Sequence, residues 1–415
     1  MNEQIITALD IGSKKIFAIS GLLTDSDIQT IGAEVLYPST DVVKQGRIVA
    51  VDDFTNEILE LFERMHQITE EKITWVVIGV SGPHVYGQPY QETLKIEPSG
   101  REITEEDIQE IERRVRAQAL GEDQASRLIL HVLPQEYIID YQGRTRKAPL
   151  GLHAHTLESR VHIITAAANP VQDIMHCLKK IGIEVEYIYP NAWAAAEAVV
   201  TDEEKRQGTL VIDLGHGTTN LAIYKDNCLV TTFSLPVGGI HIDNDLCALL
   251  HVPGDYAEEI KRNHGYCNYE NLVAERNQIL SEEIEAFTVS GRLTRKITVG
   301  DVSRIVTDRV QDILENFVLP KVERTRLLPR LSAGVVITGG GARLKGILKL
   351  CEQVFRLPVR IGVPRRINGL DRNLATPAFS VGIGLLLLAA QASHTSTPSS
   401  WWERLLEKLG RKKRK

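Results

Sequence analysis

The chain has 415 residues, of which 43% are hydrophobic and 25% charged, and its formal net charge is −6. This composition is that of an ordinary globular protein with enough apolar chain for two core-forming domains. The five cysteines are scattered and form no CxxC pair. This excludes a disulfide framework or a zinc site and predicts reduced, mostly buried thiols.

The first predicted strand, residues 5–9, ends at Asp10, and Gly12, Ser13 and Lys15 lead into a second strand at residues 16–20. Glycine permits a sharp turn, and the successive N–H groups of such a turn point into one concavity that suits a phosphate group. A carboxylate that faces phosphates requires a cation between them. Asp10 is therefore a candidate holder of hydrated Mg²⁺.

The stretch from Gly82 to Ile163 predicts a compact α+β insertion without a phosphate-binding feature. It follows a buried-strand pattern at residues 74–80. Thr104 and Asp107 predict the start of a helix. Residues 127–140 read as a strand with Pro134 as a break, and residues 160–166 as another strand.

The phosphate-binding pattern occurs a second time. The apolar run at residues 210–212 ends at Asp213, and the residues that follow it supply the turn and two hydroxyl donors: Gly215, Gly217, Thr218 and Thr219. Taken alone, this stretch also fits a glycine-rich β-hairpin with a solvated Asp. Two such hairpins that face each other would instead clamp a phosphate chain from both sides, with Mg²⁺ held through water by both aspartates.

A third glycine-rich turn follows the apolar strand at residues 335–338 and leads into a helical pattern. It consists of Gly339, Gly340, Gly341 and Ala342. These glycines would let the backbone lie flat against a nucleoside. Further on, the apolar run at residues 382–390 is too short to cross a bilayer and predicts a buried helix.

The end of the chain differs from the rest in charge. Residues 401–415 contain seven Lys and Arg against two Glu, a net charge of +5, so residues 1–400 carry −11.

Residues 392–400 predict a flexible linker. Ser400 and Glu403 then predict a helix start. One face of that helix holds Trp401, Trp402, Leu405, Leu406 and Leu409, and the cations Arg411, Lys412, Lys413, Arg414 and Lys415 follow it.

Paired tryptophans beside leucines, with a polybasic end, favour reversible binding at the headgroup boundary of an anionic membrane. An RNA-binding or calmodulin-type helix, or a helix docked on its own domain, is the alternative for this tail.

Several motifs in a fixed order carry a resemblance to a known family. They are DIGS, SGPHV, EITEEDI, LHVLPQEYIID, DLGHGTTNLAIY, LPVGGIHIDNDL, AEEIKRNHG, VVITGGGARLKG and TPAFSVGIGLL, closed by the linker and the basic tail. Over essentially the whole chain, this order resembles the bacterial FtsA cell-division family of the actin-like ATPase superfamily. The resemblance implies an α/β fold of two lobes built from duplicated ribonuclease-H-like domains, with an inserted SHS2-like α+β subdomain.

From this resemblance, we expect each lobe to consist of two chain segments that a smaller subdomain separates. The first lobe comprises residues 1–82 and 164–200, interrupted by the inserted subdomain at residues 83–163. The second lobe comprises residues 201–245 and 318–391, interrupted by a small subdomain at residues 246–317. The linker at residues 392–400 and the membrane-targeting tail at residues 401–415 follow.

The resemblance also implies a function. ATP and Mg²⁺ are the expected ligands, and the protein is expected to polymerise on the cytoplasmic face of the membrane at the division septum. There it would tether FtsZ through the C-terminal peptide of FtsZ and help to recruit later division proteins. Anionic lipids are the expected membrane partner, and no nucleic-acid partner is expected.

Nucleotide contacts are carried over position by position. They fall on Gly12, Ser13, Lys15, Gly215, His216, Gly217, Thr218, Thr219, Gly238, Gly239, Glu258, Lys261, Gly339, Gly340, Gly341 and Ala342. His216 stands where the superfamily most often has Gly, and it either contacts the nucleotide or points outward. Glu258 and Lys261 also fit an ordinary surface helix.

The residue that orients the attacking water in this superfamily falls near Asn191. An amide can hold a water molecule but cannot take its proton, so slow hydrolysis is expected. For the FtsZ peptide, the resemblance points to Arg309, with help from Arg292, because a guanidinium grips a carboxylate with two parallel bonds. An ion pair within the helix, one turn away, is the alternative role of Arg309.

Two other classes of protein share parts of this pattern. A sugar or acid kinase shares the phosphate clamp and the adenosine loop, but it needs a catalytic carboxylate facing a polyol pocket, and no motif places one. An actin-like pilus-assembly ATPase shares DIGS and much of the architecture but does not predict the membrane tail.

Overall fold

The computed structural model describes residues 4–24, 27–38, 41–96, 99–121, 126–270, 273, 277–285, 287, 296–365 and 367–394. The predicted membrane tail at residues 401–415 and the predicted partner residue Arg292 lie outside the described residues.

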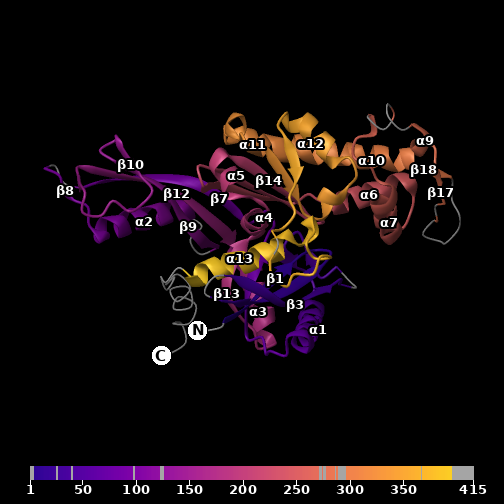
Figure 1. The fold of residues 1–415 in the computed structure, drawn as a ribbon, viewed down its shortest axis with the longest axis horizontal. Helices are drawn as coiled ribbons and strands as arrows, with labels where there is room; N and C mark the ends of the chain where they lie inside the picture. The colour runs from indigo at the N-terminus through magenta and orange to yellow at the C-terminus, as the bar shows by residue number, and fades with distance from the viewer. Residues whose placement is uncertain are drawn as a thin grey trace.

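The first lobe is built on a five-stranded sheet with the order β13-β6-β1-β2-β3. Its strands are β1 (Gln4–Ile11), β2 (Ile16–Leu23), β3 (Ile28–Leu36), β6 (Trp75–Val80) and β13 (Glu184–Pro190). Helices α1 (Val51–Thr69), α3 (Ala168–Lys180), α4 (Asn191–Val199) and α13 (Ser380–His394) accompany it (Figure 1). The predicted first hairpin is therefore present as β1, turn and β2.

The second lobe repeats this topology. Its strands are β14 (Thr209–Leu214), β15 (Thr219–Lys225), β16 (Cys228–Leu235), β19 (Val335–Thr338) and β20 (Val359–Ile361), in the order β16-β15-β14-β19-β20. In both lobes the first three strands are antiparallel, and the first strand pairs in parallel with the fourth. The two phosphate-turn candidates therefore occupy equivalent places in two copies of one fold.

The second lobe carries several helices, most of which lie above its sheet or to its right in Figure 1. They are α5 (Asp202–Gln207), α6 (Gly239–Leu250), α7 (Gly254–His264), α9 (Asn277–Leu280), α10 (Val299–Asp312), the π-helical turn η1 (Ile313–Val318), α11 (Leu319–Arg324) and α12 (Ile347–Phe355). The short strands β17 (Glu283–Ile284) and β18 (Ile297–Thr298) form a ribbon beside α9 and α10.

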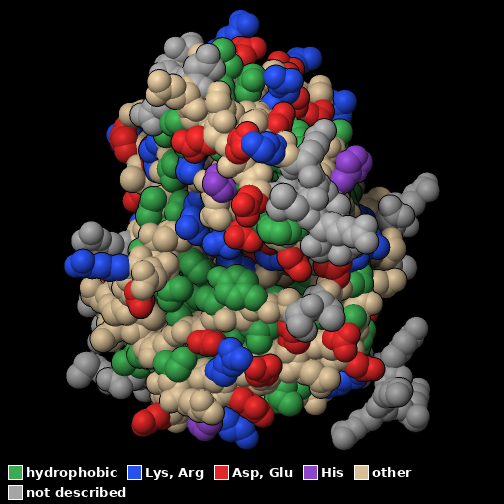
Figure 2. Space-filling view, turned by 90° about the vertical axis from the view of Figure 1, so that its right-hand side faces the viewer, with side chains coloured by type: hydrophobic (Ala, Val, Ile, Leu, Met, Phe, Trp, Pro, Cys, Tyr) green, Lys and Arg blue, Asp and Glu red, His purple; other side chains and the backbone are tan. Residues whose placement is uncertain are grey.

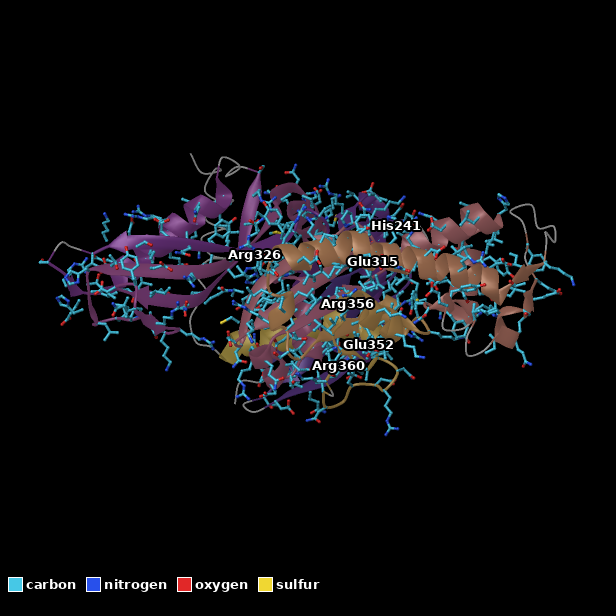
Figure 3. All side chains as sticks on the ribbon, turned by 90° about the horizontal axis from the view of Figure 1, so that it is seen from above. His241, Glu315, Arg326, Glu352, Arg356 and Arg360 are labelled. Carbon is cyan, nitrogen blue, oxygen red and sulfur yellow. The ribbon has the colours of Figure 1, made fainter. Side chains whose placement is uncertain are left out.

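The insertion contains β7 (Tyr86–Lys95), β8 (Arg101–Glu102), α2 (Glu105–Leu120), β9 (Arg127–Ile139), β10 (Gly143–Thr145), β11 (His153–Ala154) and β12 (Thr156–Ala167). It has a small apolar core of its own. Seen from above, it lies at the end of the molecule opposite α7 and α10, and the second-lobe residues Glu315, Arg326 and Arg356 lie between the two ends (Figure 3).

The insertion contacts both lobes, although the chain enters and leaves it from the first lobe. Strand β7 pairs with β16 at Tyr86–Phe233 and Gly87–Thr232, so its strands extend the sheet of the second lobe to nine. Beside this pairing, Leu130 and Ile164 pack into a core that contains residues of both lobes, such as Val77 and Val211. This placement makes the insertion a bridge between the lobes.

Two local predictions in the insertion have different outcomes. Thr104 starts α2 through a capping box with Asp107, as predicted. Pro134 does not break the strand, because β9 runs without interruption from Arg127 to Ile139. Proline lacks an N–H, and the pairing instead shifts register between Arg160 and Val161, opposite Pro134, which places a bulge there.

The apolar run near the C-terminal end forms the buried helix α13, as predicted. The expected boundaries placed residues 318–391 in the second lobe, but α13 packs against α4, β1 and β2 of the first lobe. Gly384 permits its close approach to α4, since a Cβ there would lie 1.7 Å from the Ala194 carbonyl oxygen. The helix continues to His394, so residues 392–394 are helical and not part of a linker. Within the described residues, no helix has the length and apolarity needed to cross a bilayer.

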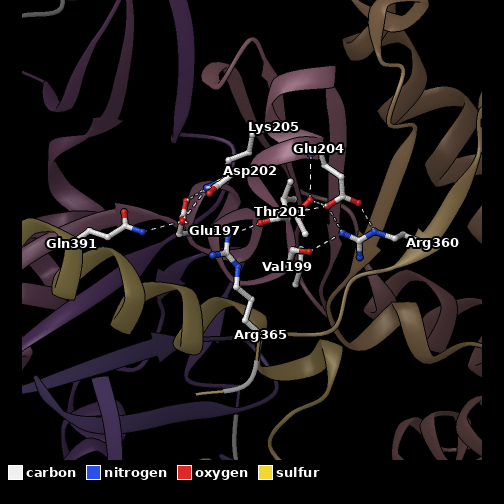
Figure 4. Close-up of polar contacts among 10 residues, drawn as sticks. Glu197, Val199, Thr201, Asp202, Glu204, Lys205, Arg360, Arg365 and Gln391 are labelled. Carbon is white, nitrogen blue, oxygen red and sulfur yellow. Dashed lines mark hydrogen bonds and ion pairs between the residues drawn. The ribbon is translucent and has the colours of Figure 1, made fainter. Parts of the chain in front are cut away.

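A buried polar network adds a second connection between the lobes (Figure 4). The Glu197 side chain on α4 is 6% exposed and accepts bonds from Lys205 Nζ on α5 at 2.8 and 2.9 Å. Gln391 on α13 donates to the same carboxylate at 3.0 Å. Nearby, Arg360 on β20 donates two hydrogen bonds of 2.6 and 2.7 Å to the Glu204 carboxylate.

Candidate nucleotide-binding cleft

The two predicted phosphate turns have the same backbone geometry. Gly12 N–H donates to the Lys15 carbonyl at 3.0 Å, and Gly215 N–H donates to the Thr218 carbonyl at 2.9 Å. Each of these glycines lies two residues after an aspartate, Asp10 or Asp213. The structure therefore contains the same hairpin twice, as the sequence indicates.

These two turns meet at the interface of the lobes. A Cβ on Gly217 of the second turn would lie 2.5 Å from Ser13 Oγ of the first turn. Asp10 and Asp213 are 6% and 5% exposed. Both carboxylates are thus buried where the two turns meet, and the phosphate clamp stays a prediction.

Burial and mutual repulsion govern the charge of this carboxylate pair. Burial raises the pKa of Asp213 to about 6, and the negative charge of Asp10 adds to the effect. Burial also raises the pKa of Asp10, against the attraction of Lys15, whose Nζ lies 3.5 Å from Asp10 Oδ2. A cation between the aspartates would offset both the desolvation and the repulsion.

The donor set fits hydrated Mg²⁺. Among the described residues, no three His, Cys, Asp or Glu side chains gather as a metal cage. Mg²⁺ keeps most of its water and is held by one or two carboxylates together with substrate phosphates. Asp10 and Asp213 would hold it, and the ion would neutralise phosphate charge there.

Lys15 is held against two aromatic rings. Its ammonium group lies 4.5 Å from the centre of the Phe379 ring and 5.5 Å from that of Phe17. These contacts keep the cation beside Asp10 at the floor of the first turn.

The predicted adenosine loop lies directly beside the second aspartate. Gly339 has a φ of +82°, and a Cβ there would lie 2.4 Å from Asp213 Oδ1. Gly341 packs on Leu214 in the same way, while the space beside Gly340 is open. Gly239 N–H donates to the Gly215 carbonyl at 2.9 Å, so the predicted ribose-side turn supports the second phosphate turn.

A group of charged side chains lies on the second lobe beside the second phosphate turn. Lys261 Nζ lies 2.7 Å from Asp243 Oδ1, and both side chains are nearly buried. His216 Nδ1 lies 3.8 Å from the same carboxylate. Burial, followed by repulsion from Lys261, lowers the pKa of His216 to about 4, so the ring is neutral at pH 7. His216 is turned toward this group, and not toward open solvent.

Lys14 joins the lobes beside this group. Its Nζ lies 2.6 Å from Glu258 Oε2 on α7. The sequence prediction named Glu258 and passed over Lys14. Viewed from the end that carries α7 and α10, charged side chains of both signs lie directly above an apolar patch in the middle of this face (Figure 2).

Of two polar residues predicted for the site, Thr219 donates a hydrogen bond within the protein and Asn191 is buried. Thr219 donates its hydroxyl to the Val237 carbonyl at 2.8 Å, so this group supports the turn. Asn191 begins α4 and is 5% exposed, and its Oδ1 accepts no bond from any residue that the structure describes. It lines a narrow space behind the second turn with Asn220, Thr232 and Ser234.

Sequence reasoning missed Asn220. In the β14–β15 ladder, Asp213 is paired with Asn220. The length of the hairpin turn was a usable signal, because it sets which residue stands opposite Asp213.

The predicted partner residue Arg309 is held by acidic side chains. Asp245 on α6 accepts two of its bonds at 2.5 and 3.0 Å, and Asp312, one turn away, accepts a third at 2.7 Å. The alternative of a pair within the helix is thus present in the structure. A partner carboxylate would have to replace Asp245 or Asp312.

Solved structures with this fold come from actin-like proteins. A chain of a PilM–PilN type IV pilus biogenesis complex matches with a TM-score of 0.64 at 16% identity, covering 93% of this chain and 98% of that one. MreB5 of Spiroplasma citri bound to ADP matches with a TM-score of 0.57 at 16% identity, covering 95% and 99%. Together with the duplicated sheets, these likenesses show that the chain has the actin-like fold.

Sequence comparison narrows this class. The family described as Cell division protein FtsA matches residues 210–384, and the SHS2 domain inserted in FTSA matches residues 82–165. FtsA of Pseudomonas aeruginosa is 31% identical over 94% of this chain and 90% of that relative. FtsA of Neisseria meningitidis is 33% identical over 94% and 91%. The chain belongs to the FtsA family of cell-division proteins, within the actin-like ATPases.

Proposed function

We propose that this protein binds ATP with Mg²⁺ between its lobes and polymerises on the cytoplasmic face of the membrane at the division septum. There it tethers FtsZ and helps to recruit later division proteins. The observation that carries the nucleotide part is the meeting of the two duplicated turns, with a buried aspartate behind each. FtsA family membership sets aside the pilus-assembly and kinase alternatives.

Solved structures of the same fold support the proposed nucleotide binding and the proposed polymerisation. MreB5 of Spiroplasma citri has been solved with ADP and with AMPPNP. MamK forms a double helical filament. In this chain, the N–H groups of the turns at Gly12 and Gly215 would face the phosphates. Asn191 would hold a water molecule without accepting its proton, so we expect slow hydrolysis. ATP would then act mainly as a bound ligand that supports folding and polymerisation.

Equilibrium titration with ATP, with and without Mg²⁺, tests the nucleotide site. We expect Mg²⁺-dependent binding that Asp10→Asn and Asp213→Asn each weaken by about ten-fold or more, because each removes a charge facing the ion. Asp308→Asn, on the exposed side of α10, is the matched control. Absence of ATP binding by the unaltered protein, or rapid turnover without partners, would overturn this part of the proposal.

Sedimentation with vesicles tests the membrane part. The full chain and a chain truncated before Ser400 are compared on vesicles with and without anionic lipid, with and without ATP. We expect binding that needs anionic lipid and disappears on truncation. The FtsZ C-terminal peptide, added with full chain and vesicles, should sediment with them. Binding that survives truncation would refute the assignment to the tail.

A further inference from the structure

A chain of buried hydrogen bonds runs from Asp213 to the first lobe. Asn220 Nδ2 donates to Asp213 Oδ2 at 2.8 Å, and Ser234 Oγ donates to Asn220 Oδ1 at 2.6 Å. The backbone N–H of Gly82 donates to Ser234 Oγ at 2.7 Å. All three donors point toward the carboxylate, so each bond polarises the next.

Sheet register explains why these side chains meet. Asp213 pairs with Asn220 between β14 and β15, and Asn220 pairs with Ser234 between β15 and β16. Residues directly opposite in a sheet present their side chains on the same face. Asn220 and Ser234 are 3% and 9% exposed, so the protein provides the partners that water would otherwise supply.

Gly82 stands at the point where the chain passes from β6 of the first lobe into the insertion. Its φ is +111°, and a Cβ there would lie 2.3 Å from the Gln45 carbonyl oxygen, so only glycine fits without strain. A few residues later, Tyr86 and Gly87 pair with β16, the strand that carries Ser234. Thr231 of β16 adds a bond to the Gly87 carbonyl at 3.0 Å.

We propose that Asn220 and Ser234 are positioning residues that connect the occupancy of the cleft to the base of the insertion, which we define as residues 82–90. The inference rests on the proposed nucleotide site. With a cation bound, Asp213 would be relieved of its repulsion from Asp10, and its carboxylate would be held in one position. The hydrogen bonds through Asn220 and Ser234 would then hold Gly82 in a fixed position, and the base of the insertion would become more rigid.

Hydrogen exchange of the full-length protein, with and without ATP and Mg²⁺, tests the coupling. We expect ATP to slow exchange in peptides covering the base of the insertion. Ser234→Ala should weaken ATP binding by no more than about ten-fold, the usual loss for one hydrogen bond, so saturating ATP still fills the cleft. In that variant the slowing should be lost, while Ser234→Thr, which keeps the hydroxyl, should restore it.

Ser20→Ala is the matched control. Ser20 is also buried, and its hydroxyl bonds to Thr7 at 2.8 Å within the sheet of the first lobe. This variant should keep the ATP-dependent slowing. Asn220→Ala breaks the same chain one bond closer to Asp213 and serves as the test where Ser234→Ala does not fold.

The outcomes separate this inference from the proposed function. If the unaltered protein binds ATP but exchange at residues 82–90 does not respond, the coupling is wrong and the nucleotide site stands. Slowing that persists in Ser234→Ala also overturns the coupling. If the unaltered protein binds no ATP, the proposed function fails and the coupling fails with it.

Discussion

Lys14 Nζ lies 2.6 Å from Glu258 Oε2, and this ion pair connects the first phosphate turn to α7. Lys14 follows Ser13 of the first turn, and Glu258 lies on a second-lobe helix. The pair therefore connects the lobes beside the phosphate turns, while the insertion and the Glu197 network connect them elsewhere.

We expect Lys14→Met to open the cleft without unfolding the protein. The Lys14 side chain is 45% exposed, so water screens the pair and its loss should change the free energy of unfolding by less than about 1 kcal/mol. Small-angle scattering should show a larger radius of gyration without nucleotide, reversed by ATP. A loss of several kcal/mol in urea unfolding would contradict this description.

Asp213→Asn should stabilise the nucleotide-free protein at neutral pH. The folded pKa of Asp213 is raised to about 6, above the unfolded value, so its contribution to stability is complete below about pH 4 and is lost as the pH rises through 6. Removing the charge should stabilise the folded protein by about 3 kcal/mol at pH 7. Urea unfolding at pH 4 and pH 7 measures this.

The Asp213→Asn prediction has an internal check. The stabilising effect should vanish near pH 4, where the native carboxyl is also neutral, and Mg²⁺-dependent ATP binding should be weakened by about ten-fold or more at pH 7. An equal effect at both pH values would show that burial of charge is not its cause.

Lys205→Ala should destabilise the junction of the lobes. It removes the main cation from the buried Glu197 carboxylate, and an uncompensated buried charge costs about 3–5 kcal/mol. Arg206→Ala, on the same helix, breaks only an exposed pair with Glu203 and is the control, expected to change stability by less than about 1 kcal/mol. Similar losses of stability in both variants would show that the buried pair of Lys205 with Glu197 does not stabilise the junction of the lobes.

Asp245→Asn should strengthen binding of the FtsZ C-terminal peptide if Arg309 is the receptor. Asp245 occupies two donors of Arg309, so neutralising it releases the guanidinium for a peptide carboxylate. Arg309→Glu should abolish binding. Fluorescence anisotropy with labelled peptide measures both variants, and unchanged affinity in both would place the peptide elsewhere.

The sequence alone determined the repeated units of this protein. Strand, aspartate and glycine turn recur at Asp10 and Asp213 because a sharp turn after a buried strand requires glycine, and this requirement is local. The capped start of α2 at Thr104 and the buried helix α13 were readable for the same reason.

Only the tertiary structure decided what each residue meets. No local pattern shows that β7 of the insertion pairs with β16, that Lys14 reaches Glu258 or that Asp245 holds Arg309. In isolation, Pro134 predicts a strand break, but β9 continues through it with a bulge at the next residue, where its pairing with β12 shifts register. Pairing, burial and charge partners depend on segments distant in the chain, whereas turn chemistry depends on adjacent residues.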